Sequence, residues 1–254
     1  KKYFVSSCIF VNCRKEINIF LLIMKKKILA IIPARGGSKG LKNKNLKKIG
    51  KNSLISLAIK SCKKLKSINK IFVSTDSKKI VREAEKQGIK VPFLRSKKIS
   101  GDKVPAIDVL YQTLNLVEKF YKEKFATIIY LEPTSPLRKT QDILLALKKF
   151  KKNNYDSLWT ISKIDLKFHP LKQVIVNKNT VSSYEKKGEK IYARQQLSQT
   201  YYRNGVCYIF KRKTILLDKK IMGKKCGYHI TSSPQVSIDN YKDLIYARKI
   251  KKFR

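Results

Sequence analysis

Residues 28–45 constrain the fold more than any other part of this sequence. They read ILAIIPARGGSKGLKNKN and begin with a continuous apolar run, Ile28 to Ile32, which is typical of a buried central strand. Pro33 ends this run, and a loop rich in glycine, arginine and lysine follows. Glycines allow tight turns and a close approach of backbone N–H groups to a ligand, and the cations supply fixed positive charge. We therefore predict a phosphate-binding loop at the carboxyl end of a parallel strand.

This loop differs from two widespread phosphate-binding motifs. It lacks the G-x-x-x-x-G-K-[ST] pattern of Walker loops, and its glycine spacing does not match the dinucleotide fingerprint. An ordinary glycine-rich surface turn is the alternative interpretation. The coincidence of a strand, glycines and cations in one short stretch favours phosphate binding.

Predicted strands and helices alternate through most of the chain. Short apolar runs predict strands at residues 28–32, 71–73, 91–93, 126–131 and 157–161. Apolar residues at helical spacing predict helices over residues 53–66, 78–87, 104–120 and 141–151. This alternation predicts a doubly wound, mostly parallel α/β sheet of Rossmann-like type. The rhythm breaks after residue 161, where 174–176 and 190–194 are predicted strands of a small β-rich excursion.

The positive charge of the chain is extreme, with a formal net charge of +42 at pH 7. Only ten of its 59 cationic residues are arginine, and the lysines are scattered rather than clustered. A nucleic-acid reader would be expected to use more arginine on one face, so we expect no nucleic-acid partner. The charge would still attract anionic substrates over long range.

Cysteine and histidine patterns give no metal site. The five cysteines form no C-x-x-C pair and no zinc spacing, and the two histidines lie far apart. Scattered cysteines of odd number indicate reduced thiols and a cytoplasmic protein.

The N-terminal residues 1–24 do not fit the domain pattern. The chain begins at Lys1, and Met24 stands just before three lysines and the first predicted strand. The apolar piece from Ile17 to Ile23 is too short to span a bilayer and has no small-residue cleavage site, so we expect no membrane association. We interpret residues 1–24 as a non-native or disordered extension and residues 25–254 as the domain, with a genuine N-terminal arm as the alternative.

Short motifs along residues 27–248 resemble one known family, the acylneuraminate cytidylyltransferases or CMP-sialic acid synthetases. The motifs are ARGGSKGLKNKN at 34–45, STD at 74–76, FLR at 93–95, EPTSPLR at 132–138, HPLK at 169–172, RQQ at 194–196, NGVCY at 204–208 and SID at 237–239. The resemblance implies transfer of CMP from CTP to the anomeric hydroxyl of a sialic-type nine-carbon 2-keto sugar acid, with release of pyrophosphate. Such products are activated sugars for cell-surface polysaccharides.

The resemblance also implies roles for individual residues. Charge neutralisation on the triphosphate would fall to Arg35, Lys39 and Lys44. Nucleotide contacts would come from Gly36, Gly37, Ser38, Asn45 and Arg95. Sugar contacts would come from Glu132, Ser135, Arg194, Asn204 and Tyr208, with Lys172 supplied by a partner chain. Asp239 would hold the cofactor Mg²⁺ and help to deprotonate the sugar hydroxyl, unless it is only the N-cap of a helix over residues 240–250.

Two positions depart from the family pattern. Glu132 stands where the family usually has glutamine, and an ionised carboxylate can only accept hydrogen bonds. Ser237 stands where the family has the first of two metal-binding aspartates. Each substitution would either retune the site or weaken its activity.

In relatives, the region corresponding to about 165–200 forms a dimerisation arm, so the resemblance implies a homodimer. Two other functions stay open. One is a nucleotidyltransferase for another acidic sugar, such as 3-deoxy-manno-octulosonate. The other is a basic binding protein on the same scaffold that has lost its chemistry, which would bind polyanions with a steep salt dependence and without turnover.

Overall fold

The computed structural model describes residues 27–252, and the extension predicted over residues 1–24 lies outside that range. Six strands form the central sheet, in the order β10-β6-β9-β5-β1-β4. Their bounds are β1 (Ile28–Pro33), β4 (Lys70–Ser74), β5 (Thr127–Tyr130), β6 (Ser157–Lys163), β9 (Tyr201–Lys211) and β10 (Cys226–Ile230). The strand β9 is antiparallel to its neighbours β5 and β6, and the other three pairings are parallel. The prediction of a mostly parallel sheet is therefore confirmed.

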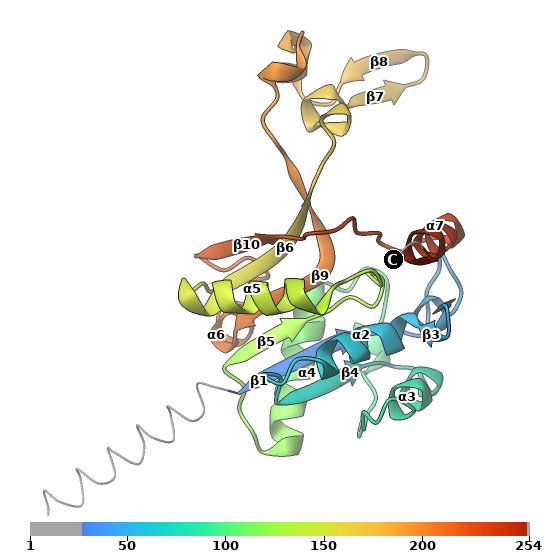
Figure 1. Ribbon diagram of the computed structural model, residues 1–254, viewed down its shortest axis with the longest axis vertical. Coiled ribbons are helices and arrows are strands. Elements are labelled where there is room, and N and C mark those ends of the chain that lie inside the picture. The colour runs from blue at the N-terminus through green and yellow to red at the C-terminus, as the bar shows by residue number, and fades with distance from the viewer. Residues whose placement is uncertain (1–26, 253–254) are drawn as a thin grey trace, which may run out of the picture.

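Helices cover both faces of this sheet (Figure 1). One face packs against α2 (Leu54–Lys63), α3 (Lys78–Glu85) and α5 (Thr140–Lys152). The other face packs against α4 (Ala106–Tyr121) and the short α6 (Arg212–Leu216). The doubly wound arrangement follows from this layering.

The strand β1 is the centre of the hydrophobic core. Ile28, Ala30 and Ile32 point to the layer of α2, α3 and α5, whereas Leu29 and Ile31 point to the layer of α4. All five side chains are buried, because the strand is covered on both faces. Full burial of each large aliphatic side chain contributes about 1.5–3 kcal/mol to the stability of the fold. The position of β1 is therefore well determined, and with it the start of the loop that follows.

A third apolar cluster positions the C-terminal helix α7 (Tyr241–Lys252) beside the loop after β1. Leu244 and Ala247 of α7 pack against Ile49 and Leu54, which belong to the small hairpin β2 (Lys48–Ile49) and β3 (Asn52–Ser53) and to the start of α2. This packing brings α7, which is the last helix of the sequence, close to the glycine-rich loop near its beginning. Within residues 27–252, no helix is long and apolar enough to cross a membrane.

Two predicted strands are wrong. Residues 91–93 form no strand, because Pro92 has no N–H to donate to a ladder. Residues 190–194 form no strand either: Ile191 and Ala193 are extended, but the backbone N–H groups of Tyr192 and Ala193 donate to Oε1 of Gln196 instead of to a neighbouring strand.

The β-rich excursion forms a projection from the body of the molecule (Figure 1). The strands β6 and β9 extend beyond the sheet, and the chain between them carries the hairpin β7 (Val174–Asn177) and β8 (Thr180–Ser183). We call residues 164–200 the arm. Four short 3-10 helices complete it, at Leu166–Phe168, Pro170–Lys172, Lys186–Lys190 and Arg194–Gln196.

Candidate active site

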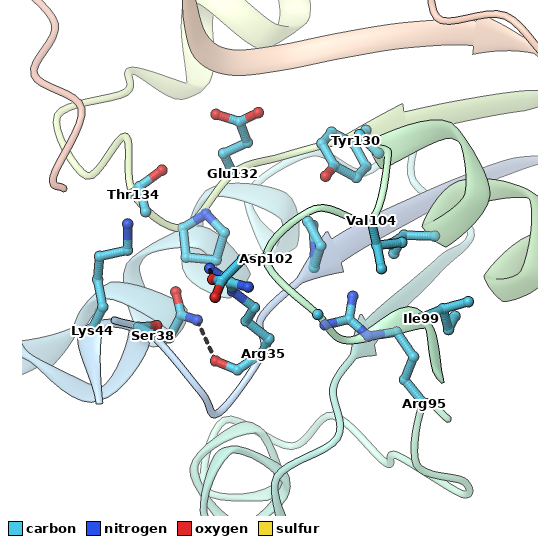
Figure 2. Close-up of a pocket in the computed structure, with 16 residues that line it drawn as sticks. Arg35, Ser38, Lys44, Arg95, Ile99, Asp102, Val104, Tyr130, Glu132 and Thr134 are labelled. Carbon is cyan, nitrogen blue, oxygen red and sulfur yellow. Dashed lines mark hydrogen bonds and ion pairs between the residues drawn. The ribbon is translucent and has the colours of Figure 1, made fainter. Parts of the chain in front are cut away.

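The carboxyl ends of the neighbouring strands β1 and β5 open into one pocket (Figure 2). Six residues that the sequence assigned to nucleotide or sugar contacts line it: Arg35, Ser38, Lys44, Asn45, Arg95 and Glu132. Open α/β sheets bind ligands at this edge, because the loops that leave parallel strands meet there. Figure 2 shows Glu132 and Tyr130 at one end of the pocket, and Arg95 and Ile99 at the other.

Hydrogen bonds and close packing with neighbouring segments hold the glycine-rich loop in place. The backbone N–H of Gly36 donates to Oδ1 of Asp76 at 2.8 Å, and a Cβ on Gly36 would stand 2.8 Å from Cβ of Ser77. Glycine is therefore required at residue 36 by the close approach of the loop after β4. The buried Asn45 donates from Nδ2 to the backbone oxygen of Arg35 at 3.0 Å, so its amide fixes the loop. Gly37 has open space around it.

Each of the three cations of this loop forms an ion pair with a carboxylate in this structure. Arg35 is ion-paired with Asp102, and Nζ of Lys39 lies 3.1 Å from the other oxygen of the same carboxylate. These contacts, with Lys39 the stronger, hold the pKa of Asp102 below its usual range. Nζ of Lys44 lies 2.9 Å from Oδ1 of Asp239. A polyanionic ligand could replace both carboxylates, because phosphate oxygens offer the same charge and acceptors.

Arg95 brings a further positive charge to the pocket. Its backbone N–H donates to the oxygen of Thr75 at 2.7 Å, and its Nε donates to Oγ of Ser100 at 3.1 Å. Burial lowers the pKa of its guanidinium, and the negative charge of Asp76 partly opposes this effect. Within residues 27–252, no carboxylate forms an ion pair with Arg95, and a buried guanidinium in that situation favours an anionic ligand.

At the opposite end of the pocket, the carboxylate of Glu132 packs onto the backbone of β9. Gly205 of β9 has a φ of 67°, and a Cβ there would stand 2.6 Å from Oγ of Ser135 and closer still to Oε2 of Glu132. Burial raises the pKa of Glu132, and the positive charges of Arg138 and Arg203 oppose that rise. Because Gly205 has no side chain, it leaves room for the Glu132 carboxylate at this end of the pocket.

Ser135 and Asn204 lie inside the protein rather than in the pocket. Oγ of Ser135 donates to the backbone oxygen of Asn204 at 2.8 Å. The Nδ2 of Asn204 donates to Ser162 and Thr231, at 2.9 and 3.0 Å. Both side chains are buried, and together they tie the loop after β5 to the strand β9. Tyr208 of β9 lines a small cavity next to the pocket, together with Glu132.

The C-terminal motif shows which residue caps α7. The N–H of Asp243 donates to Oδ1 of Asn240 at 3.1 Å, and Oδ2 of Asp243 accepts from the N–H groups of Asp239 and Asn240 at 2.9 Å. This reciprocal pattern is a capping box with Asn240 as the N-cap. The Asp239 side chain is therefore free of the cap and turns to Lys44, with Oγ of Ser237 at 3.3 Å.

The donors at this motif suit a metal ion only in company with a ligand. Among residues 27–252, no three side chains of His, Cys, Asp or Glu gather closely enough to hold a metal. Mg²⁺ is often bound by one or two carboxylates together with substrate phosphates and water. The exposed carboxylate of Asp239 and the hydroxyl of Ser237 fit that arrangement.

Lys172 and Arg194 do not line the pocket. Both lie exposed on the arm, and the charge of Arg194 is close enough to Asp165 to lower the pKa of that carboxyl, after the larger effect of the Lys167 N–H. The resemblance implies that Lys172 comes from a partner chain and Arg194 from the chain that forms the pocket. The structure places them on the same projection, so the two side chains would have to reach a site together.

The residues that were not assigned from the sequence include Asp102 and Tyr130 of the pocket and Arg203 of the small cavity next to it. Asp102 is one of 17 acidic residues in the chain, but no sequence pattern showed that it pairs with Arg35 and Lys39. Tyr130 is one residue of an apolar run, and its exposure to the pocket depends on register. Arg203 was visible as one of the few arginines, directly before the Asn-Gly pair.

Comparisons with known proteins show what this chain is similar to. Residues 29–252 match the family described as "Cytidylyltransferase". The chain is 35% identical over 204 residues to "Post-translational flagellin modification protein B" of Campylobacter coli, covering 80% of this chain and 86% of that protein. It is 33% identical over 204 residues to "CMP-N,N'-diacetyllegionaminic acid synthase" of Campylobacter jejuni, with the same coverage of both chains.

A solved structure shares the fold. The CMP:2-keto-3-deoxy-manno-octonic acid synthetase in complex with CTP superposes with a TM-score of 0.66 at 15% identity, over 89% of this chain and 99% of that one. At that identity the likeness concerns the fold alone.

Proposed function

Because this chain belongs to the cytidylyltransferase family, we propose that it transfers CMP from CTP to the anomeric hydroxyl of a sialic-type nine-carbon 2-keto sugar acid. The observation that carries this proposal is the polarity of the pocket. Arg35 and Arg95 bring positive charge to the part of the pocket away from Glu132, and Lys44 lies at one side of it, where its charge also acts on the Glu132 carboxyl and opposes the rise in its pKa. A ligand with a triphosphate at one end and a hydroxylated sugar at the other matches that distribution.

The chemistry is a displacement at the α-phosphorus of CTP. The anomeric oxygen attacks this phosphorus, the bond from the phosphorus to the β-phosphate bridging oxygen breaks, and pyrophosphate leaves with the electron pair. The proton of the sugar hydroxyl passes to the carboxylate of Asp239. Arg35, Lys39 and Lys44 exchange their carboxylate partners for phosphate oxygens and stabilise the charge that develops on pyrophosphate.

The remaining loop residues position the nucleotide. Ser38 lines the pocket and donates a hydrogen bond to a phosphate oxygen, and Gly37 has space for a phosphate to approach its backbone. Arg95 holds the nucleotide from the opposite side. Asn45 acts through Arg35, whose backbone it fixes. Positioning of this kind lowers the entropic part of the barrier.

Asp239, with Ser237 beside it, would hold Mg²⁺ together with the phosphates of CTP. When bound, the ion neutralises phosphate charge at the reacting centre. A single carboxylate at this motif predicts weak binding of Mg²⁺ without nucleotide and joint binding with CTP.

The arm supports a homodimer as part of this proposal. Its hairpin exposes Val174, Val176 and Val181, each with more than half of its surface accessible. Apolar side chains so exposed on a projecting hairpin are typical of a contact surface. In a homodimer the arm would carry Lys172 and Arg194 to the sugar carboxylate in the pocket of the second copy.

A pyrophosphate-release assay tests the function. The protein is incubated with CTP and Mg²⁺ and with N-acetylneuraminic, N,N'-diacetyllegionaminic or pseudaminic acid in turn. We expect release that depends on both CTP and one of these acids, and little release with ATP, GTP or UTP. The name of the C. jejuni relative supports diacetyllegionaminic acid as the first acid to test. Faster release with 3-deoxy-manno-octulosonate, or none with any acid, would contradict the proposal.

A further inference from the structure

A second pocket, which we call the cationic pocket, shares no lining residue with the candidate active site. It is formed by one face of α2, by the end of the loop that joins β5 to α5, and by the last turn of α7, which lies beside that loop (Figure 1). Its volume is about 580 Å³, within the range of about 300–1,000 Å³ that is typical of small-ligand sites. Five of its lining residues are cations: Lys60, Lys64, Arg138, Lys139 and Lys251.

These five cations have no carboxylate partners. Within residues 27–252, no acidic residue lines the cationic pocket, and none of the five forms an ion pair with Asp or Glu. A groove at the opposite edge of the sheet also has several cations, but there Lys211 and Lys213 pair with Asp156, and Arg212 pairs with Glu118. The cationic pocket therefore combines a concave shape with positive charge that the described residues leave uncompensated.

Arg138 is the buried member of the set. It is only 8% exposed, and its Nη2 donates to the backbone oxygen of Glu132. Its other donors, Nε and Nη1, are buried and have no hydrogen-bond partner among the described residues. Burial lowers the pKa of this guanidinium, and the charge of Glu132 partly opposes the effect. Because an incompletely paired buried cation is costly, an anion in the adjoining pocket would stabilise it.

The helix α5 directs its amino end at the same pocket. It begins at Thr140, which lines the pocket, and no side chain caps this end among the described residues, because the N-cap residue Lys139 carries no acceptor. The acidic residue of the first turn, Asp142, is buried and accepts hydrogen bonds from Ser232. The first N–H groups of this 13-residue helix are therefore available to an anion, and the helix dipole favours one there.

Two of the lysines repel each other across the pocket. Lys60 belongs to α2 and Lys251 to α7. Burial lowers the pKa of Lys251, and the charge of Lys60 lowers it further. The acceptor that Lys60 finds is uncharged, since its Nζ donates to Oδ1 of Asn52. An anion between the two ammonium groups would replace repulsion with attraction.

We propose that the cationic pocket binds an oligophosphate, either free or as the phosphate tail of a nucleotide, at a site separate from the phosphate loop. The four lysines and the amino end of α5 contact the phosphate oxygens, and Arg138 adds a buried positive charge. Two or three linked phosphates compensate more of these cations than a single phosphate or carboxylate does. This inference does not depend on the proposed transfer reaction.

Calorimetry with inorganic triphosphate, without metal and at low salt, tests the proposal. The full chain carries Arg35→Ala, which weakens the phosphate loop and isolates the second site. We expect affinity to rise from phosphate to pyrophosphate to triphosphate. Adding Lys60→Gln/Lys251→Gln should weaken triphosphate binding at least about tenfold, because two charge-assisted contacts are lost. No binding to the Arg35→Ala chain, or no gain from phosphate to triphosphate, would overturn the proposal.

A matched pair of substitutions controls for the overall charge of the chain. Lys63→Gln/Lys249→Gln removes the same charge from the same two helices, and both lysines are exposed but do not line the pocket. This control should bind triphosphate within about twofold of the Arg35→Ala chain. Equal weakening by the two pairs would reduce the binding to general attraction by a basic surface and overturn the site, as would no weakening by either.

CTP and ATP, titrated in the same way, distinguish the two sources of the phosphates. Affinities equal to that of triphosphate support a free oligophosphate, and tighter binding of a nucleotide supports a phosphate tail. Nucleotide and triphosphate binding that both ignore Lys60→Gln/Lys251→Gln would overturn the site. That result would leave the proposed function standing if the parent releases pyrophosphate, and a parent that releases none would leave this site standing if triphosphate binds as expected.

Discussion

Lys44 and Asp239 form an ion pair, with Nζ and Oδ1 2.9 Å apart, although 195 residues separate them in the chain. The contact joins the loop after β1 to the segment before α7. The backbone supports it, since a Cβ on Gly40 would stand 2.7 Å from the backbone oxygen of Asp239. On the proposed function, each partner would exchange the other for a ligand: Lys44 for a phosphate oxygen, and Asp239 for the metal ion.

The first prediction concerns the acidic motif. Asp239→Asn should nearly abolish turnover, because the metal loses the carboxylate that this motif supplies. Ser237→Asp should lower the Mg²⁺ concentration needed for half-maximal rate, since it adds a second carboxylate beside the first. A magnesium titration at saturating CTP and sugar acid measures both. Asp243→Asn is the control for the helix cap, and a titration of Asp239→Asn that matches the parent would place the metal elsewhere, at Asp76 or Asp102.

The second prediction concerns the phosphate loop. Arg35→Ala and Lys39→Ala should each lower kcat/KM by about 10²-fold or more, because each removes charge from the developing pyrophosphate. Lys42→Ala is the matched control, since Lys42 belongs to the same loop but, unlike Arg35 and Lys39, is not one of the cations that the structure pairs with Asp102. Steady-state kinetics with CTP as the varied substrate measure the effect. Near-parental values for both Arg35→Ala and Lys39→Ala would remove this loop from the mechanism.

The third prediction concerns Asp102, which competes with the ligand for Arg35 and Lys39. Because those cations lower its pKa, the carboxyl stays ionised and competes throughout the neutral pH range. Asp102→Asn should therefore bind metal-free pyrophosphate several-fold more tightly than the parent, as measured by calorimetry at low salt. Equal or weaker binding would show that Asp102 contributes to the ligand site instead of blocking it.

The fourth prediction concerns Gly205. Its left-handed backbone costs about 1–2 kcal/mol for a residue with a Cβ, and that Cβ would also displace Glu132 and Ser135. Gly50→Ala is the matched control, because Gly50 has a similar φ of 61° but nothing within 4 Å of a Cβ. Gly205→Ala should lower the melting temperature more than Gly50→Ala. Equal shifts would show that the contact with Glu132 is easily relieved.

The sequence predicted the body of this molecule well because its patterns are local. The apolar run before Pro33 and the alternation of strands and helices gave the sheet and its layers. The prediction failed at residues 91–93, where Pro92 was itself a local signal against a strand. It also failed at residues 190–194, where the backbone N–H of Tyr192 bonds to Gln196 instead of to a neighbouring strand. Local pattern carries no information on such contacts.

The sequence showed which residue types belong to the site, but it did not show which of them form ion pairs with one another. Loop cations and the acidic motif were visible in the sequence, but the contacts of Lys44 with Asp239 and of Arg35 with Asp102 join distant segments. Likewise, Asn204 and Ser135 carried the resemblance, yet their side chains are used inside the fold.

The last prediction concerns Glu118, a buried carboxylate on α4 that ties α6 to the sheet. Its two oxygens accept from Nε and Nη2 of Arg212, both at 2.8 Å, and Oε1 also accepts from the N–H of Phe125 at 3.0 Å. Burial alone would raise the pKa of this carboxyl, but the hydrogen bonds from Arg212 and Phe125 outweigh it, and the pKa is lowered.

Glu118→Gln should reduce the free energy of unfolding by about 2 kcal/mol at pH 7, a value between those of exposed and fully buried pairs, since Arg212 is about one-third exposed. A folded-state pKa below the unfolded value means that this stabilisation is present above about pH 4.3 and is lost as the pH falls through the folded pKa. Urea unfolding at several pH values should therefore show the parent and variant converging in acid. Glu123→Gln, which removes a more exposed carboxylate paired with Lys27, should cost less, and a difference between parent and Glu118→Gln that does not change with pH would contradict the prediction.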